Sequence, residues 1–137
     1  MRVAQWALPG SSDDAPADCV LFHFPGGGGV DDNIQRWLGQ FAQPDGDSSA
    51  AAAFRAEREV EGLRVTLVRV EGTYRDQMPP MTGPIIERPS YGLFGAVFTP
   101  PGDPYFLKCT GPAVVIAGQQ EAMVSFIDSF RVHETAP

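Results

Sequence analysis

The stretch PGGGGVDDN, residues 25–33, contains the residue types that most resemble a phosphate-binding loop. Such a loop points backbone N–H groups at the anion from a helix N-terminus, and it usually adds a Lys and a Ser or Thr. This stretch lacks those side chains, and Asp31 and Asp32 bring negative charge to the place of the anion. We therefore interpret it as a strand-to-helix connection with glycines at positive φ, and we expect no nucleotide binding.

A thiol nucleophile with a nearby base would have to come from His23 and Cys109. Cys109 occupies the position of a small apolar residue in the strand FLKCTG, so we expect a buried thiol of low reactivity. His23 fits a histidine within a sheet. A disulfide between Cys19 and Cys109 would need adjacent strands and an oxidising compartment, and the sequence leaves this pairing open.

Acid–base and metal chemistry find little support in the residue spacing. Glu57, Glu59 and Glu61 alternate along one predicted strand, which places them on a solvated face. No His, Cys or acidic residues have the spacing of a zinc or calcium site. Met78 and Met81 could attract Cu(I), but two thioethers alone make a poor site. We predict no metal, no cofactor and no catalytic residue.

The segment YRDQMPPMTGPIIERP, residues 74–89, is the best candidate for recognition. It is too rich in proline for a central strand and longer than an ordinary connection, so we predict a long loop. Apolar side chains on a loop stiffened by prolines either fold back over the core or contact a partner. The candidate binding residues are Met78, Met81, Ile85, Ile86 and, just after the segment, Tyr91.

Composition limits the partners that this chain could have. The chain has 137 residues, of which 43% are hydrophobic, and this fits a single domain over residues 1–137. The net charge of −7 lacks the positive field that attracts nucleic acid, so we expect no nucleic-acid partner. No apolar run approaches the ~18 residues of a membrane helix, so we expect a soluble chain without membrane insertion. The expected partner is an unknown protein or a small apolar ligand, and the oligomeric state stays open.

Hydrophobic periodicity places the elements that would position these residues. Strands are predicted at residues 2–8, 19–24, 54–60, 63–70, 91–98 and 104–110. Helices are predicted after Asp31 or Asp32 and from Gly111 onward, with Trp37 and Phe126 buried against a sheet. Strands joined by hairpins outnumber helices, so we expect an α+β domain with an antiparallel sheet of about six strands.

Several short motifs follow one another in a recognisable order. They are W-x-L-P at 6–9, N-x-x-R-W at 33–37, G-T-Y at 72–74, Y-x-L-x-G-A at 91–96, Y-F-L-K at 105–108 and F-I-D-S-F at 126–130. This order resembles uncharacterised bacterial proteins that are similar to the PsbP-like superfamily, named for an extrinsic photosystem II subunit. The resemblance covers nearly the whole chain, but the P-x-G-W element that relatives carry before this segment is missing.

The resemblance implies a central antiparallel sheet flanked by helices, which is an α/β/α sandwich of the PsbP-like or import-factor-like kind. It also implies a binding or adaptor role and not an enzymatic one. Two rival hypotheses stay open: a small enzyme that uses a Cys/His or carboxylate site, and a structural envelope module. The location stays open too: if a leader has been removed from this chain, the protein would be exported or envelope-associated.

Overall fold

The strands of the chain form one antiparallel sheet. The computed structural model describes residues 2–8, 10, 16–23, 30–43, 53–60, 62–77, 82–99 and 104–129. Its elements are β1 (Arg2–Leu8), β2 (Ala17–His23), α1 (Val30–Leu38), β3 (Phe41–Ala42), β4 (Phe54–Val60), β5 (Leu63–Gln77), β6 (Ile85–Thr99), β7 (Tyr105–Pro112), α3 (Ala113–Gly118) and α4 (Gln120–Ser129). The strand order is β1-β2-β7-β6-β5-β3, and β4 also pairs with β5.

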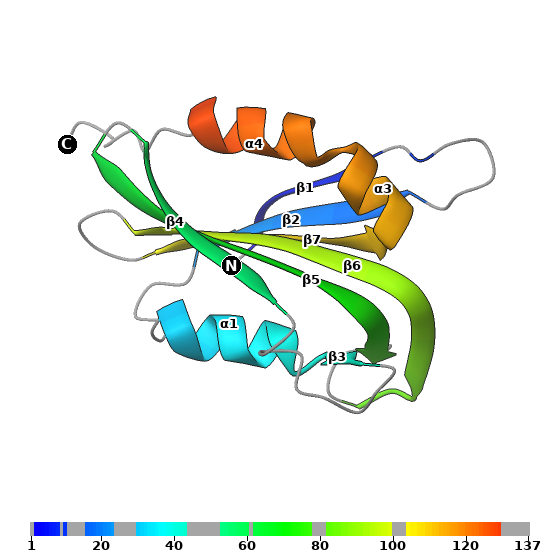
Figure 1. The fold of residues 1–137 in the computed structure, drawn as a ribbon. Helices are drawn as coiled ribbons and strands as arrows, with labels where there is room; N and C mark the ends of the chain where they lie inside the picture. The colour runs from blue at the N-terminus through cyan, green and yellow to red at the C-terminus, as the bar shows by residue number, and fades with distance from the viewer. Residues whose placement is uncertain are drawn as a thin grey trace.

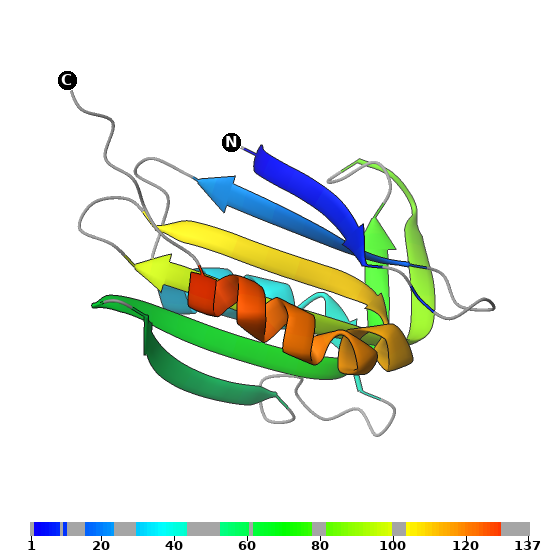
Figure 2. The ribbon, with the colours of Figure 1, turned by 90° about the horizontal axis from the view of Figure 1, so that it is seen from above.

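Helices cover both faces of this sheet. Figure 1 shows α1 on one face and α3 with α4 on the other, and Figure 2 shows α3 and α4 following one another across their face. The predicted α+β class with a central antiparallel sheet is confirmed. In the described part of the chain the sheet has seven strands, one more than the predicted six because of the two-residue β3. None of the described helices has the length and apolarity needed to span a membrane.

The sheet separates two apolar cores, since successive side chains of a strand point to opposite faces. On the side of α3 and α4 the buried side chains include Leu21, Phe94, Phe98, Leu107, Ile116 and Ile127. On the side of α1 they include Ile34, Trp37, Val68, Leu93, Val97 and Phe106. Because both faces are covered, β2, β7 and β6 alternate between two apolar rows instead of an apolar and a polar one.

Helix α1 is held to the sheet by its apolar stripe. Trp37 is 5% exposed, so its predicted burial is confirmed. It lies over Gly95 of β6, where an added Cβ would be only 2.7 Å from the indole ring, so a glycine leaves room for Trp37. The helix ends at Leu38, and the next apolar residue, Phe41, belongs to β3. Phe126 is half-buried and contacts Trp6, with 5.1 Å between the ring centroids.

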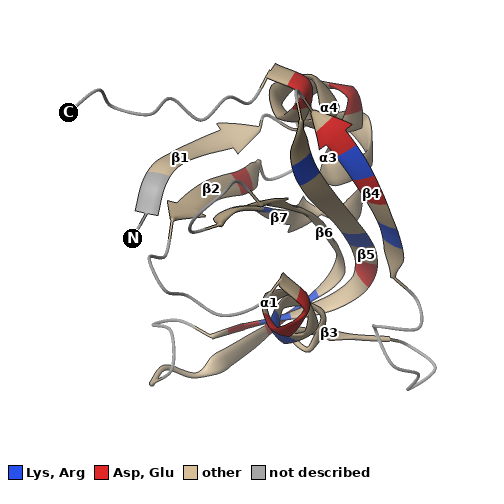
Figure 3. Cartoon of the chain, turned by 90° about the vertical axis from the view of Figure 1, so that its left-hand side faces the viewer, with Lys and Arg blue, Asp and Glu red and all other residues tan. Residues whose placement is uncertain are grey.

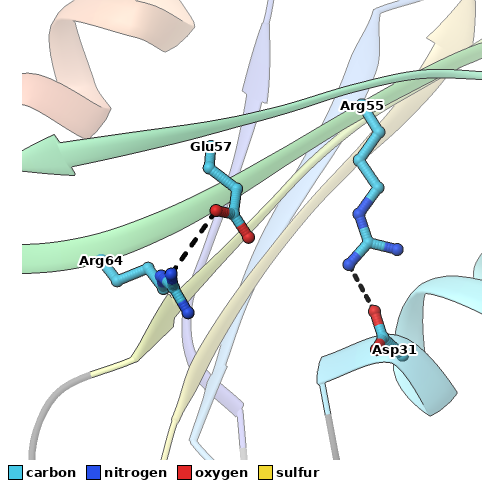
Figure 4. A network of polar contacts seen from close by, with 4 residues as sticks. All are labelled: Asp31, Arg55, Glu57 and Arg64. Atoms are coloured by element: carbon cyan, nitrogen blue, oxygen red, sulfur yellow. Dashed lines mark hydrogen bonds and ion pairs between the residues drawn. The ribbon is translucent and has the colours of Figure 1, made fainter.

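Strand β4 is a charged edge of the sheet, and ion pairs connect it to α1, β5 and α4. Figure 3 shows acidic and basic residues alternating along β4. Arg55 pairs with Asp31 in the first turn of α1, and Glu57 lies 3.6 Å from Arg64 of β5 (Figure 4). Glu57 and Glu59 are exposed, as predicted, and charged side chains of this kind discourage pairing with a further strand.

The predicted long loop at residues 74–89 is wrong over most of its length. β5 continues to Gln77 and β6 begins at Ile85, so this segment extends one long hairpin. The pairing register shifts between Gly72 and Tyr74, where Pro89 and Ser90 lie opposite Thr73. Ser90 has a φ of 56°, the left-handed conformation that an extra residue in a β-bulge adopts. The bulge bends the hairpin, and Figure 1 shows its far end curving toward α1 and β3.

Gly111 of β7 gives a stability test of the sheet. A Cβ added there would lie 2.6 Å from the Cα of Ala17, so Gly111→Ala must push two backbones apart. We expect a loss of about 1–3 kcal/mol in the free energy of unfolding, measured by denaturant titration. Gly118→Ala is the matched control, since nothing lies within 4 Å of its added Cβ and alanine favours a helix. Equal midpoints for the two variants would contradict this packing of β7 on β2.

Candidate functional site

The end of the β5–β6 hairpin carries the predicted binding residues that the structure describes. Ile85 and Ile86 are 48% and 43% exposed, so they do not fold back over the core. β7 pairs with β6 only from Tyr91 onward, so no described strand pairs with residues 85–90 on the side away from β5. Met78 and Met81 lie outside the described residues.

Tyr91, the remaining predicted binding residue, is half-buried in an aromatic cluster at the bend. Its ring stacks on Tyr74 with 6.0 Å between centroids and an interplanar angle of 9°. Tyr74 in turn lies 5.1 Å from the ring of Phe41 in β3. Arg88 is 5.9 Å from the Tyr91 centroid, and its Nε donates to the carboxylate of Asp76 at 3.0 Å. Tyr91 therefore holds the bend in place, and it is not part of the exposed isoleucine surface.

Lys108 of β7 is a half-buried cation beside this aromatic cluster. Its Nζ donates to Oε1 of Gln40 at 2.5 Å and lies 5.7 Å from the Tyr74 centroid. The pKa of Lys108 is lowered to about 8, mainly by burial and then by the nearby charge of Arg36, while Asp76 opposes the shift. Burial also raises the pKa of the Tyr74 phenol, so Tyr74 stays neutral where Lys108 begins to titrate.

A cavity of about 170 Å³ opens at Lys108, between α1 and strands β2 and β7. Its polar lining consists of Lys108, Arg36, Asn33 and Gln40, and its apolar walls are Phe22, Trp37 and Phe106. Arg36 donates a hydrogen bond to the side-chain oxygen of Asn33, and Asn33 is a buried residue. We call this the Lys108 cavity. Its residues come from three segments far apart in the sequence, and the only signal that could have pointed to it is that Lys108 is the single lysine of the chain.

A second cavity of about 330 Å³ lies between β4, β5 and α4. Phe54, which is 57% exposed, forms part of its rim together with Val124 of α4. Arg69 lies 5.7 Å from the Phe54 centroid and donates to Gln120. This cavity is a shallow apolar groove beside the charged edge strand.

Cys19 and Cys109 form a disulfide, so the prediction of a free thiol at Cys109 is wrong. The two residues are directly opposite each other in the antiparallel pair β2–β7, with 4.1 Å between their Cα atoms. Both are completely buried, as was predicted for Cys109. The sequence left the pairing open because the two residues are 90 positions apart and their register depends on the whole sheet.

The rival hypothesis of a Cys109 nucleophile with His23 as its base loses its thiol to this disulfide. His23 stacks on Tyr105 with 4.2 Å between ring centroids and an interplanar angle of 8°. Cys109 lies opposite Cys19, and His23 is four positions from Cys19 along β2, which is about 13 Å at the rise of a strand. Among the described residues, no three His, Cys, Asp or Glu side chains are grouped as they would be around a metal ion. The four glycines of residues 26–29 lie outside the described residues.

Comparison with known proteins supports the fold but not a function. No protein-family model matches the sequence, and no curated protein matches it either. The chain is similar to the crystal structure of PA94, a protein of unknown function from Pseudomonas aeruginosa described as a "Putative Regulator". The TM-score is 0.61 at 13% sequence identity, and the match covers 96% of this chain and 83% of the other. At this identity, the likeness shows that the two chains share an α+β fold.

Removal of the disulfide tests its contribution to stability. The bond closes a long stretch of chain, so it restricts the unfolded state strongly. We expect the double variant Cys19→Ala with Cys109→Ala to lose about 2–4 kcal/mol of unfolding free energy. A reductant should lower the denaturation midpoint of the parent protein and leave that of the double variant unchanged. Two thiols titrating in the denatured parent without reductant would contradict the bond.

The lowered pKa of Lys108 predicts a pH-dependent stability. Between about 8 and 10.5 the native amine has lost its proton while the unfolded amine keeps it, so stability rises with pH across this window. The stability that the neutral native amine contributes at high pH is lost as the pH falls toward 8. We expect Lys108→Met to be more stable than the parent near neutral pH and to lose that advantage toward pH 10. Selective ¹³Cε labelling of lysine gives one signal that reports the pKa directly, and a value near 10.4 would contradict the burial of the amine.

Proposed function

We propose that this chain is a non-enzymatic binding or adaptor domain that recognises a partner protein through the end of its β5–β6 hairpin. The observation that carries the proposal is the exposure of Ile85 and Ile86 on a hairpin that extends past β7. Neighbouring residues in a strand point to opposite faces, so the chain would have to cover both faces to bury them. A partner that contacts both faces would bury the two side chains together.

Preorganisation of the hairpin supports this role. The bulge at Ser90 bends it, the Tyr74–Tyr91 stack supports the bend, and the Arg88–Asp76 pair joins its two strands. A recognition element that is already ordered loses less conformational entropy when it binds. Its edge at residues 85–90, with which no described strand pairs on that side, also offers backbone groups to an extended segment of a partner, which is a common mode of peptide recognition.

The proposed location follows from the disulfide. Disulfides persist in oxidising compartments and are rare in reducing ones, so the Cys19–Cys109 bond supports an exported or envelope-associated protein. The resemblance to the PsbP-like superfamily implies a binding role, so it supports the proposed recognition of a partner protein. Cys109 is bonded to Cys19 and His23 stacks on Tyr105, so the two cannot act as nucleophile and base, and the enzyme hypothesis loses its main support.

An apolar small ligand is the second candidate partner. It is favoured by the groove between β4 and α4, where the ring of Phe54 is exposed at the rim. A ligand in this groove would contact residues on the opposite face of the sheet from the bend of the hairpin. Substitutions at Phe54 and at Ile86 would therefore affect the two candidate partners separately.

Affinity capture with a hairpin variant tests the leading proposal. We expect Ile85→Asp with Ile86→Asp to reduce capture of the partner at least about tenfold, because two charges would have to be desolvated at the contact. The bait is the tagged chain, the source is an extract of the parent organism, and the readout is quantitative mass spectrometry.

Val114→Asp is the matched control for this experiment. Val114 is 66% exposed on α3, so it is an apolar residue more exposed than the two isoleucines and away from the end of the hairpin. Circular dichroism establishes that all three proteins are folded. Equal capture by the parent and the hairpin variant, or no protein enriched by the parent, would contradict the proposed contact.

A further inference from the structure

We propose that the Lys108 cavity binds the carboxylate of a small organic acid with an apolar or aromatic body. This inference goes beyond the proposed protein contact, and it depends on a separate set of residues. The Lys108 cavity lies between α1 and the sheet, whereas Ile85 and Ile86 lie at the end of the hairpin. Each of the two proposals can therefore fail while the other stands.

Unbalanced positive charge is the first reason for an anionic ligand. Among the described residues, no carboxylate lies within ion-pair distance of Lys108 or Arg36. The acidic group that raises the pKa of Lys108 is Asp76, and it is already bonded to Arg88. Two cations thus line one cavity of a chain whose net charge is −7, and their partners among the described residues are amide oxygens and a ring face.

The cost of burying Lys108 is the second reason. An ammonium taken out of water is destabilising unless an opposite charge or several hydrogen bonds replace its hydration. Here the described partners are the neutral oxygen of Gln40 and the face of Tyr74. A bound carboxylate would supply the missing charge and would accept hydrogen bonds from both Lys108 and Arg36.

The shape and lining of the cavity define the rest of the ligand. A volume of about 170 Å³ suits a molecule of one ring or a short alkyl chain, since a cavity of ~150 Å³ accepts benzene. Phe22, Trp37 and Phe106 would contact the apolar body while the cations hold the carboxylate. Inorganic phosphate would use the cations but leave these walls without a contact, and a nucleotide exceeds the volume.

Benzoate is the test ligand because it combines one carboxylate with one ring. Titration of the full chain is followed by calorimetry and by the ¹³Cε signal of Lys108, which is the single lysine. We expect a Kd of about 1 mM or tighter. Bound benzoate should also raise the midpoint of the Lys108 titration by at least about half a pH unit, since a nearby anion favours the charged amine.

Matched ligands and variants separate this site from general anion binding. Benzyl alcohol, which has the ring but no charge, and inorganic phosphate, which has charge but no ring, should each bind at least about tenfold more weakly than benzoate. Lys108→Met removes the charge but keeps an unbranched side chain only one atom shorter, and it should weaken benzoate binding at least tenfold, as should Arg36→Gln. Arg64→Gln is the control, because Arg64 pairs with Glu57 on the exposed surface and should leave binding unchanged.

Several results would overturn the inference. They are the absence of a benzoate-dependent shift in the Lys108 signal, equal binding of benzoate by Lys108→Met and the parent, and phosphate binding as tight as benzoate binding. If Lys108→Met failed to fold, Arg36→Gln would carry the same test, since Arg36 is exposed and its loss leaves the core intact. The variant Ile85→Asp with Ile86→Asp should keep benzoate binding, which separates this result from the test of the partner contact.

Discussion

The bulge in β6 is the constraint on which the candidate sites depend. Without the extra residue at Pro89 and Ser90, the β5–β6 hairpin would continue in the plane of the sheet. The bend instead turns the far half of the hairpin toward α1. Tyr74 therefore lies beside the side chain of Lys108, although its position along the sheet is well beyond that of Lys108. One local change in strand pairing therefore covers a buried cation and presents an isoleucine pair to solvent.

The two faces of the sheet have different chemistry as a result. On the face of α3 and α4, the disulfide and the His23–Tyr105 stack are held between apolar side chains. On the face of α1, a line of aromatic and cationic groups runs from Phe41 to Lys108. The face of α1 offers Lys108 and Arg36 to a polar ligand, whereas the face of α3 and α4 offers the groove beside Phe54.

Local patterns predicted the elements well, and distant pairings poorly. The alternating pattern predicted strands at residues 54–60 and 63–70, and these pair as β4 and β5, because each signal lies within a few residues. The prolines of residues 74–89 suggested a loop, yet Pro84 comes directly before β6 and Pro89 lies in the bulge, where a missing N–H is tolerated. The Lys108 cavity and the disulfide depend on the register of β2 with β7, which no local pattern encodes.

The disulfide also determines how the chain would respond to a protease. It joins residues 19 and 109, so α1 and strands β3 to β6 lie within one covalent ring, while β1, α3 and α4 lie outside it. A single cleavage between those two cysteines opens the ring but leaves every part of the chain covalently attached. The nicked protein would keep its mass on a non-reducing gel and separate into two fragments only after reduction. One cut in a connecting segment between the two cysteines therefore does not release the β5–β6 hairpin.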